Sequence, residues 1–110
     1  FVALCKDFQI GVDVEFLRPR KKELLEYCCN EDELSIFREF YKKSINQETV
    51  MWSLKESVQK SDQIISEPNH YIITSSEKNI LNVKKGKNTW ISSLFEKDGY
   101  IFSISLKTIN

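Results

Sequence analysis

Hydrophobic and polar residues alternate along residues 9–16, which predicts a β-strand with two different faces. The even-numbered positions from 10 to 16 are all apolar, whereas Gly11, Asp13 and Glu15 share the other face. An apolar strand face is normally buried, so we expect the even-numbered side chains to lie on the core. The acidic face is then displayed, and Gly11 leaves room there for another group to approach closely. Residues 1–5 are expected to form the antiparallel partner strand, joined to this one by a turn.

Helical periodicity replaces this alternation in the middle of the chain. Residues 21–28 predict a first, short helix. Asn30 followed by Glu33 matches a capping box and predicts a second helix that continues to about Lys42. A third helix is expected over residues 46–60.

The third predicted helix separates hydrophobic residues from motif residues. The side expected to be buried carries Val50, Met51, Leu54 and Val58. The nearly opposite side carries Trp52, Lys55, Glu56, Gln59 and Lys60. We therefore expect this second group to face outward or into a cleft.

Strand-like segments return in the C-terminal part of the chain. The strand candidates are residues 71–74, 80–83, 90–95 and 100–106, with turns expected at 68–69, 85–88 and 98–99. Strands, then helices, then strands favour an α+β fold in which helices pack on one side of an antiparallel sheet. At 110 residues, the chain is long enough for one domain, spanning residues 1–110.

Composition excludes several classes of partner. Sixteen basic residues balance sixteen acidic ones, so no net field attracts nucleic acid or an anionic membrane. No apolar run reaches membrane-spanning length, and we expect no signal peptide. Of the three cysteines, Cys28 and Cys29 are adjacent, which argues against a disulfide framework and favours a reducing, cytoplasmic setting. The sequence opens on Phe1 in a strand-like segment, so we expect residues upstream to be missing.

Asp13 and Glu15 are candidate metal ligands. Alternate residues on one strand face lie about 7 Å apart, and two carboxylates at that spacing repel each other unless a cation lies between them. Magnesium takes oxygen ligands, with one or two carboxylates completed by water and phosphate oxygens. The simpler alternative is a solvated strand face, where acidic residues are common.

Glu56 and Lys60 form a second candidate group. A Glu four residues before a Lys is also an ordinary helical ion pair, worth a few tenths of a kcal/mol. Trp52 indicates that an ordinary ion pair is not the full explanation, because a large indole on a polar helix face needs a partner to pack against. Lys55 adds a second cation, and lysines bind phosphate as point charges. Together with the strand acids, these groups suit a divalent cation and a pyrophosphate.

The two segments resemble the signature motifs of the 4′-phosphopantetheinyl transferases. Residues 11–15 match Gly-x-Asp-x-Glu, and residues 52–60 match Trp-x-x-Lys-Glu-x-x-x-Lys, in the order and separation typical of the surfactin-synthetase-activating type. The acid at Glu33 and the closing strand at residues 99–104 are similar to the same family. The resemblance covers nearly the whole chain.

The resemblance implies a reaction and a set of roles. Phosphopantetheine would pass from coenzyme A to a serine of an acyl or peptidyl carrier protein, releasing 3′,5′-ADP. Asp13, Glu15 and Glu56 would hold Mg²⁺, and Lys55 and Lys60 would bind the phosphates of coenzyme A. Glu56 and Lys60 would be the catalytic residues, with Glu56 accepting the serine proton directly or through a metal-bound water.

The chain departs from the family pattern in two places. Ser61 to Ile64 stand where the family usually has glycines. The family type is built from two similar halves, and the resemblance is to the C-terminal half, so an upstream half is expected to be missing. Two other interpretations stay open. One is a short, trimeric holo-acyl-carrier-protein synthase, and the other is a non-catalytic module that binds carrier proteins.

Overall fold

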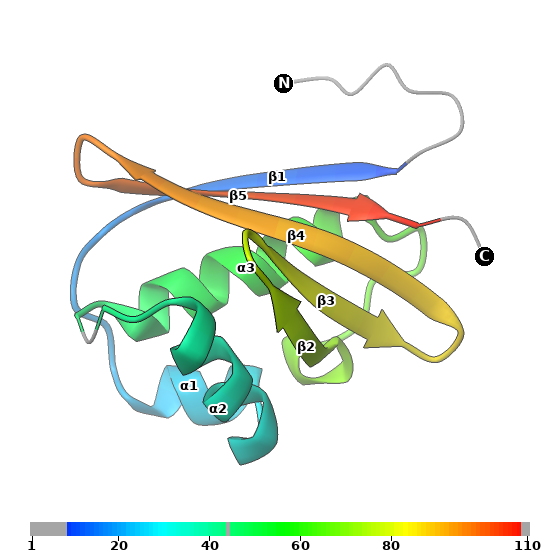
Figure 1. Cartoon of the computed structure of the whole chain (residues 1–110), viewed down its shortest axis with the longest axis horizontal. Coiled ribbons are helices and arrows are strands. Elements are labelled where there is room, and N and C mark those ends of the chain that lie inside the picture. Colours follow the sequence, from blue (N-terminus) through cyan, green and yellow to red (C-terminus); the bar gives the residue numbers. More distant parts are fainter. Residues whose placement is uncertain (1–8, 44, 109–110) are drawn as a thin grey trace.

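The computed structural model describes residues 9–43 and 45–108, and these form an α+β fold of one antiparallel sheet and three α-helices (Figure 1). The strands are β1 (Ile10–Phe16), β2 (Ile72–Glu77), β3 (Ile80–Lys85), β4 (Asn88–Lys97) and β5 (Tyr100–Lys107). The helices are α1 (Glu23–Cys28), α2 (Glu31–Phe40) and α3 (Gln47–Ser61), with a short 3₁₀ helix η1 at Pro68–His70. The strand order is β1-β5-β4-β3-β2, so β1 is an outermost strand among the five that the structure describes. The predicted fold class is confirmed.

Local sequence signals are confirmed where they are strongest. The side chain of Asn30 accepts a hydrogen bond from the backbone N–H of Glu33, and the Glu33 carboxylate accepts one from the Asn30 N–H, completing the capping box that begins α2. Asp98 and Gly99 have φ angles of 53° and 80°. Positive φ at both central residues defines the tight hairpin turn that joins β4 to β5. The strand and turn predicted over residues 1–8 lie outside the described residues.

Helix α3 packs very closely on the sheet, through serines rather than large side chains. The hydroxyls of Ser53 and Ser103 lie 2.8 Å apart, and those of Ser57 and Ser105 lie 2.6 Å apart. A Cβ atom on Gly11 would lie 1.8 Å from the backbone carbonyl oxygen of Ser57. Gly11 is therefore required because the backbone of α3 crosses β1 at this residue.

This packing reverses the predicted faces of β1. The expectation that the apolar face of residues 10–16 lies on the core is wrong: Gly11 and Asp13 are buried against the helix, whereas Val14 and Phe16 are 46% and 55% exposed. A period of two shows that a strand has two faces but does not show which one a helix will cover. Here the small residues allow the closer backbone approach.

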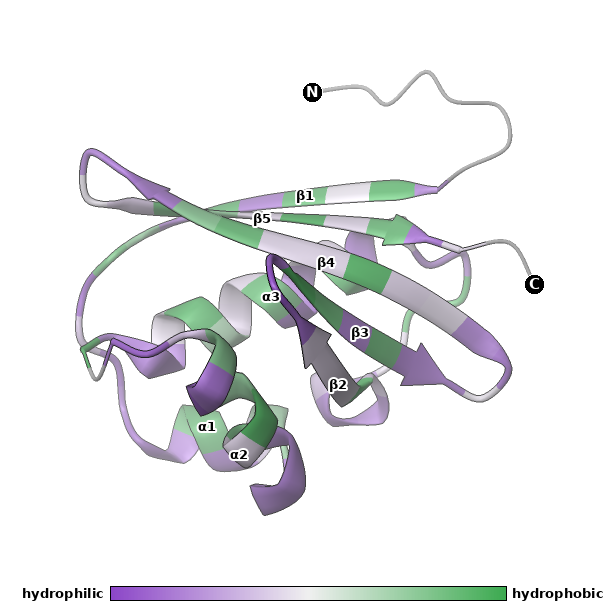
Figure 2. Ribbon diagram, in the orientation of Figure 1, coloured by the Kyte–Doolittle hydropathy of each residue, from purple (hydrophilic) through white to green (hydrophobic). Residues whose placement is uncertain are grey.

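The opposite face of the sheet is consequently apolar and open. Phe95, Tyr100 and Ile104 are between 40% and 49% exposed. The rings of Phe16 and Tyr100 meet edge to face at 5.5 Å, and those of Phe95 and Phe102 stack at 4.7 Å. All three described helices lie on the other side of the sheet, so no described element covers these side chains, although the strands are rich in hydrophobic residues (Figures 1 and 2).

The core lies between the helices and the inner face of the sheet. Its largest fully buried hydrophobic side chains include Trp90, Tyr71, Phe37, Met51, Leu54, Ile73, Leu81, Ile101, Val50 and Val58. The predicted buried side of α3 is thus confirmed. No helix in the described part of the chain is both long and apolar enough to cross a membrane.

Candidate active site

The two motif segments meet where α3 crosses β1. The Nζ atom of Lys60 lies 2.8 Å from Oδ1 of Asp13, linking the end of α3 to the middle of β1. On the same strand face, Glu15 accepts a hydrogen bond from Arg20, 3.2 Å away. Because β1 is the outermost strand on its side among the described strands, the cluster lies at the border of the described sheet.

Three carboxyl groups influence one another in this cluster. The pKa of Glu15 is raised to about 7, first by burial and then by a hydrogen bond to Asp13 and the charge of Asp13, while Arg20 opposes the rise. Burial and the charge of Asp13 also raise the pKa of Glu56, against the influence of Lys60. The site therefore has an excess of negative charge that the nearby basic groups only partly offset.

The donor set fits a hard divalent cation. Asp13 is 4% exposed, and its Oδ2 atom is buried with no hydrogen-bond partner. An unpaired buried carboxylate oxygen beside two further carboxyl groups is a costly arrangement that a cation would relieve. Within the described ranges, no three His, Cys, Asp or Glu side chains are already arranged as a metal-binding group. Metal binding by Asp13, Glu15 and Glu56 stays a prediction.

Lys60 is more accessible at this site than Arg20, whose side chain is 28% exposed. The side chain of Lys60 is 51% exposed, and the hydrogen bond to Asp13 raises its pKa. It borders a cavity of about 490 Å³ on the β1 edge, lined also by Ile10, Gly11, Val12 and Val14. A charged ammonium at the rim of an open cavity can reach an anionic ligand.

Lys55 does not share this position. It is completely buried, with Nζ 2.6 Å from Oε1 of Glu33 and a hydrogen bond donated to the backbone carbonyl of Tyr71. The expectation that Lys55 lies on the outward side of the helix is therefore wrong. The long aliphatic stem carries the charge into the interior, where Glu33 supplies the counter-charge. Its role as a phosphate ligand stays a prediction, and the ammonium would have to leave Glu33.

The model of the 4′-phosphopantetheinyl transferase superfamily matches residues 9–93, a range that contains β1, all three helices and the carboxylate cluster. The chain belongs to this superfamily. Its members' chemistry is in general the transfer of phosphopantetheine. No individual curated protein matches the chain at a significant level.

From the sequence, Glu33 was predicted only to cap the second helix and to match an acidic position of the family. The structure shows that Oε1 of Glu33 also accepts the backbone N–H of Ile73 at 2.9 Å. One buried carboxylate thus contacts the start of α2, the middle of α3 and the start of β2. The sequence does contain one signal for this contact, because a buried lysine requires an acidic partner. The periodicity did not place Lys55 in the interior, however, and Glu33 lies 22 positions away.

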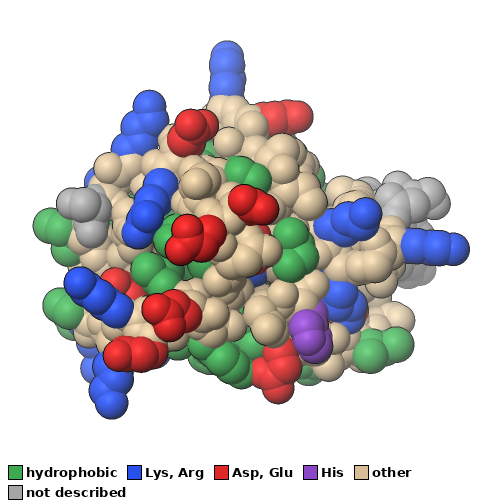
Figure 3. Space-filling view, turned by 90° about the horizontal axis from the view of Figure 1, so that it is seen from below, with side chains coloured by type: hydrophobic (Ala, Val, Ile, Leu, Met, Phe, Trp, Pro, Cys, Tyr) green, Lys and Arg blue, Asp and Glu red, His purple; other side chains and the backbone are tan. Residues whose placement is uncertain are grey.

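The transferase chain also has a groove on its helical side, next to the motif helix. A cavity of about 470 Å³ is lined by Tyr27, Trp52, Gln59, Ile65, Ser66, Glu67, Pro68 and His70. Trp52 is partly buried, and it packs against the hydrophobic core while also lining this groove. Figure 3 shows this side of the molecule, with apolar, acidic and basic side chains around the purple histidine.

Proposed function

We propose that this chain is the C-terminal half of a phosphopantetheinyl transferase of the surfactin-synthetase-activating type, acting with Mg²⁺ on coenzyme A and a carrier protein. The observation that carries the proposal is the meeting of Asp13, Glu15, Glu56 and Lys60 at one sheet edge. Membership of the superfamily supports the class of reaction. The free, buried thiols of Cys28 and Cys29 support a reducing, cytoplasmic setting.

The residues would divide the work between binding and proton transfer. Asp13, Glu15 and Glu56 would hold Mg²⁺, which when bound would neutralise charge on the phosphoryl oxygens and the leaving group. Lys60 would bind the pyrophosphate from the rim of the neighbouring cavity. Both contributions act on charge that develops during transfer.

Glu56 would be the general base. The carrier serine oxygen attacks the phosphorus that bears the pantetheine arm, and the bond from that phosphorus to the bridging oxygen of 3′,5′-ADP breaks. The serine proton passes to Glu56, and 3′,5′-ADP leaves with the bonding electron pair. A carboxylate can accept that proton directly or through a metal-bound water.

The apolar sheet face that no described element covers supports the view that these residues act together with a second domain or a second copy of the chain. Val14, Phe16, Tyr100 and Ile104 form an exposed apolar surface next to the cavity that Lys60 borders. An apolar face of this kind marks an association surface, which a covalently joined upstream half would cover. In the short, trimeric type of synthase, a second copy of the chain would cover it. Sedimentation distinguishes the trimeric type from the two-half type, because only the trimeric type gives a stable trimer.

Transfer is tested by mass spectrometry of an apo-carrier protein mixed with coenzyme A, Mg²⁺ and the chain joined to its upstream half. We expect the carrier to gain the mass of phosphopantetheine, and Asp13→Ala or Glu56→Ala to abolish the gain. Glu39→Ala is the matched control, because Glu39 is an exposed acid on α2 outside the cluster.

Transfer that survives both Asp13→Ala and Glu56→Ala would contradict the assigned site. The non-catalytic alternative predicts carrier binding without a calorimetric signal from coenzyme A. A clear Mg²⁺-dependent coenzyme A signal that disappears in Asp13→Ala but persists in Glu39→Ala excludes that alternative.

A further inference from the structure

Two adjacent isoleucines are presented to solvent directly after the motif helix. Ile64 and Ile65 are 77% and 70% exposed, and they follow the end of α3 by three and four residues. Leaving two large aliphatic side chains in water costs hydrophobic free energy that burial in an interface would recover. Only Ile45, on the segment before α3, is comparably exposed among the large hydrophobic residues that the structure describes.

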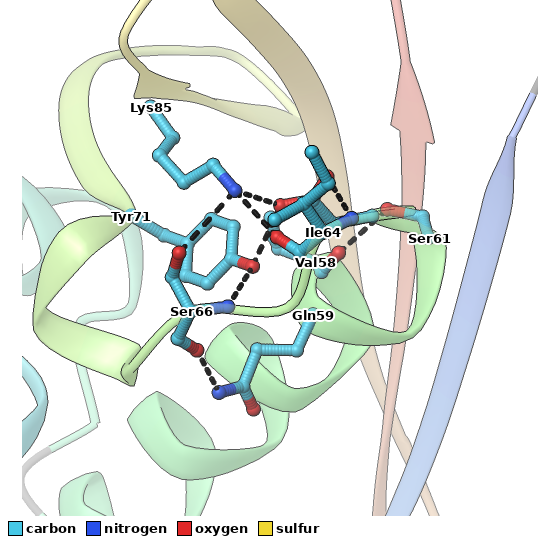
Figure 4. Close-up of polar contacts among 8 residues, drawn as sticks. Val58, Gln59, Ser61, Ile64, Ser66, Tyr71 and Lys85 are labelled. Atoms are coloured by element: carbon cyan, nitrogen blue, oxygen red, sulfur yellow. Dashed lines mark hydrogen bonds and ion pairs between the residues drawn. The ribbon is translucent and has the colours of Figure 1, made fainter.

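The loop that carries them is held in place by a partly buried polar cluster (Figure 4). The Tyr71 hydroxyl donates to Oδ2 of Asp62 at 2.8 Å. The Lys85 ammonium bonds to the same Asp62 oxygen and, at 2.7 Å, to the backbone carbonyl of Ile64. Hydrogen bonds from Lys85 and Tyr71 lower the pKa of Asp62 against the opposing effect of burial. The carboxylate that organises the cluster therefore stays ionised.

The far end of the same loop is fixed as well. The backbone N–H of Ser66 donates to the Tyr71 hydroxyl at 3.0 Å, and the Gln59 side chain donates to the Ser66 carbonyl at 2.7 Å (Figure 4). Both flanks of the isoleucine pair are thus tied to α3 and to the sheet. The loop is ordered before any partner arrives, so binding there requires little further loss of conformational entropy.

This loop adjoins the proposed reactive groups. Ile65 lines the groove together with Trp52 and Gln59 of α3. Trp52, Glu56 and Gln59 are separated by four and three residues, so they form one stripe along the helix. Glu56, the carboxylate proposed to receive the serine proton, therefore lies on the same side of α3 as Trp52 and Gln59, which line the groove.

We propose that Ile64, Ile65 and the Trp52 groove form the docking surface for the acceptor protein, and that the groove takes an apolar side chain near its reactive serine. The inference rests on the proposed function, which supplies two substrates to choose between. The described lining of the groove contains no lysine or arginine, and its one carboxylate, Glu67, accepts a hydrogen bond from Tyr27. Such a lining suits an uncharged protein surface and not the phosphates of coenzyme A.

The test compares Ile64→Ser/Ile65→Ser with wild type and with Ile45→Ser, an equally exposed isoleucine elsewhere. Calorimetry measures the Kd for apo-carrier protein and, separately, the Kd for coenzyme A with Mg²⁺. We expect the double variant to bind carrier protein roughly tenfold more weakly or worse. Its affinity for coenzyme A and its thermal unfolding should match wild type, and Ile45→Ser should change neither Kd.

Equal carrier affinity in the double variant and wild type would overturn the docking surface, as would a wild-type chain that binds no carrier protein. A loss confined to coenzyme A would overturn it too, because the pantetheine arm would then occupy the groove. If the chain joined to its upstream half binds carrier protein through the isoleucines but does not bind coenzyme A, the proposed function is refuted and the docking surface stands.

Discussion

At the scale of single residues, the raised pKa of Glu15 shows that the ionised carboxylates of the cluster destabilise one another. The carboxyl group of Glu15 titrates at about 7 instead of the ordinary 4.5 because of burial and its neighbour Asp13. Between those two pH values the folded chain binds more protons than the unfolded chain. The free energy of unfolding that Glu15 contributes is therefore fully present below about pH 4.5 and is lost as the pH rises through 7.

We predict that Glu15→Gln weakens this pH dependence. Glutamine cannot ionise, so the variant should lose less stability than wild type when the pH rises from about 5 to about 8. Urea unfolding of both proteins at the two pH values, without divalent cations, measures the difference. An equal loss in both proteins would show that the raised pKa of Glu15 does not affect folding.

Gly11 gives a second prediction at this scale. Gly11→Ala places a methyl group against backbone atoms of Ser57 and Ser61 that cannot move independently, so we expect a loss of about 3 kcal/mol or more. Gly86→Ala is the control, because Gly86 has a φ of 61° but nothing within 4 Å of the added methyl. Strain alone should cost that variant about 1–2 kcal/mol. Urea unfolding would contradict the close helix–strand approach if both variants lost the same free energy.

At the scale of elements, the Lys55–Glu33 pair connects α2, α3 and β2 inside the core. We predict that Lys55→Met lowers the free energy of unfolding by about 3–5 kcal/mol, because it leaves a buried carboxylate without its cation. Adding Glu33→Gln should recover part of that loss by removing the unpaired charge. A double-mutant cycle in urea measures the coupling.

The same cycle separates two roles for Lys55. A lysine that serves only as a phosphate ligand would leave the unliganded protein as stable as before when replaced by methionine. Unchanged stability in Lys55→Met, with no coupling to Glu33, would therefore contradict the structural role and favour the phosphate role.

At the scale of the whole molecule, the sheet has helices on one side and, on the other, an apolar face that no described element covers. We predict that the chain associates with itself, or binds a hydrophobic dye, through this face. Val14→Thr/Phe16→Thr should reduce both effects, because threonine is more polar and still has a high β-propensity. Sedimentation velocity over a range of concentrations and dye fluorescence measure them. Ile45→Thr is the control, and an equal reduction in the control would show that the effects do not depend on the sheet face.

The sequence alone determined the features that depend on neighbouring residues. The Asn30–Glu33 capping box and the Asp98–Gly99 turn each form within four residues, so their geometry follows from local backbone chemistry. The buried side of α3 followed from a helical period, which likewise needs no knowledge of the partner. The motif spacing pointed to the superfamily for the same reason, since each motif lies within one element.

Only the tertiary structure decided which surfaces meet. Whether β1 buries Gly11 or Val14 depends on what packs against it, and serines on α3 and β5 allow the closer contact with Gly11. The partner of Lys55 and the isoleucine surface after α3 depend on contacts between residues distant in sequence. Alternation and helical period specify that an element has two sides, whereas the choice between them is a difference in packing free energy that only the assembled molecule sets.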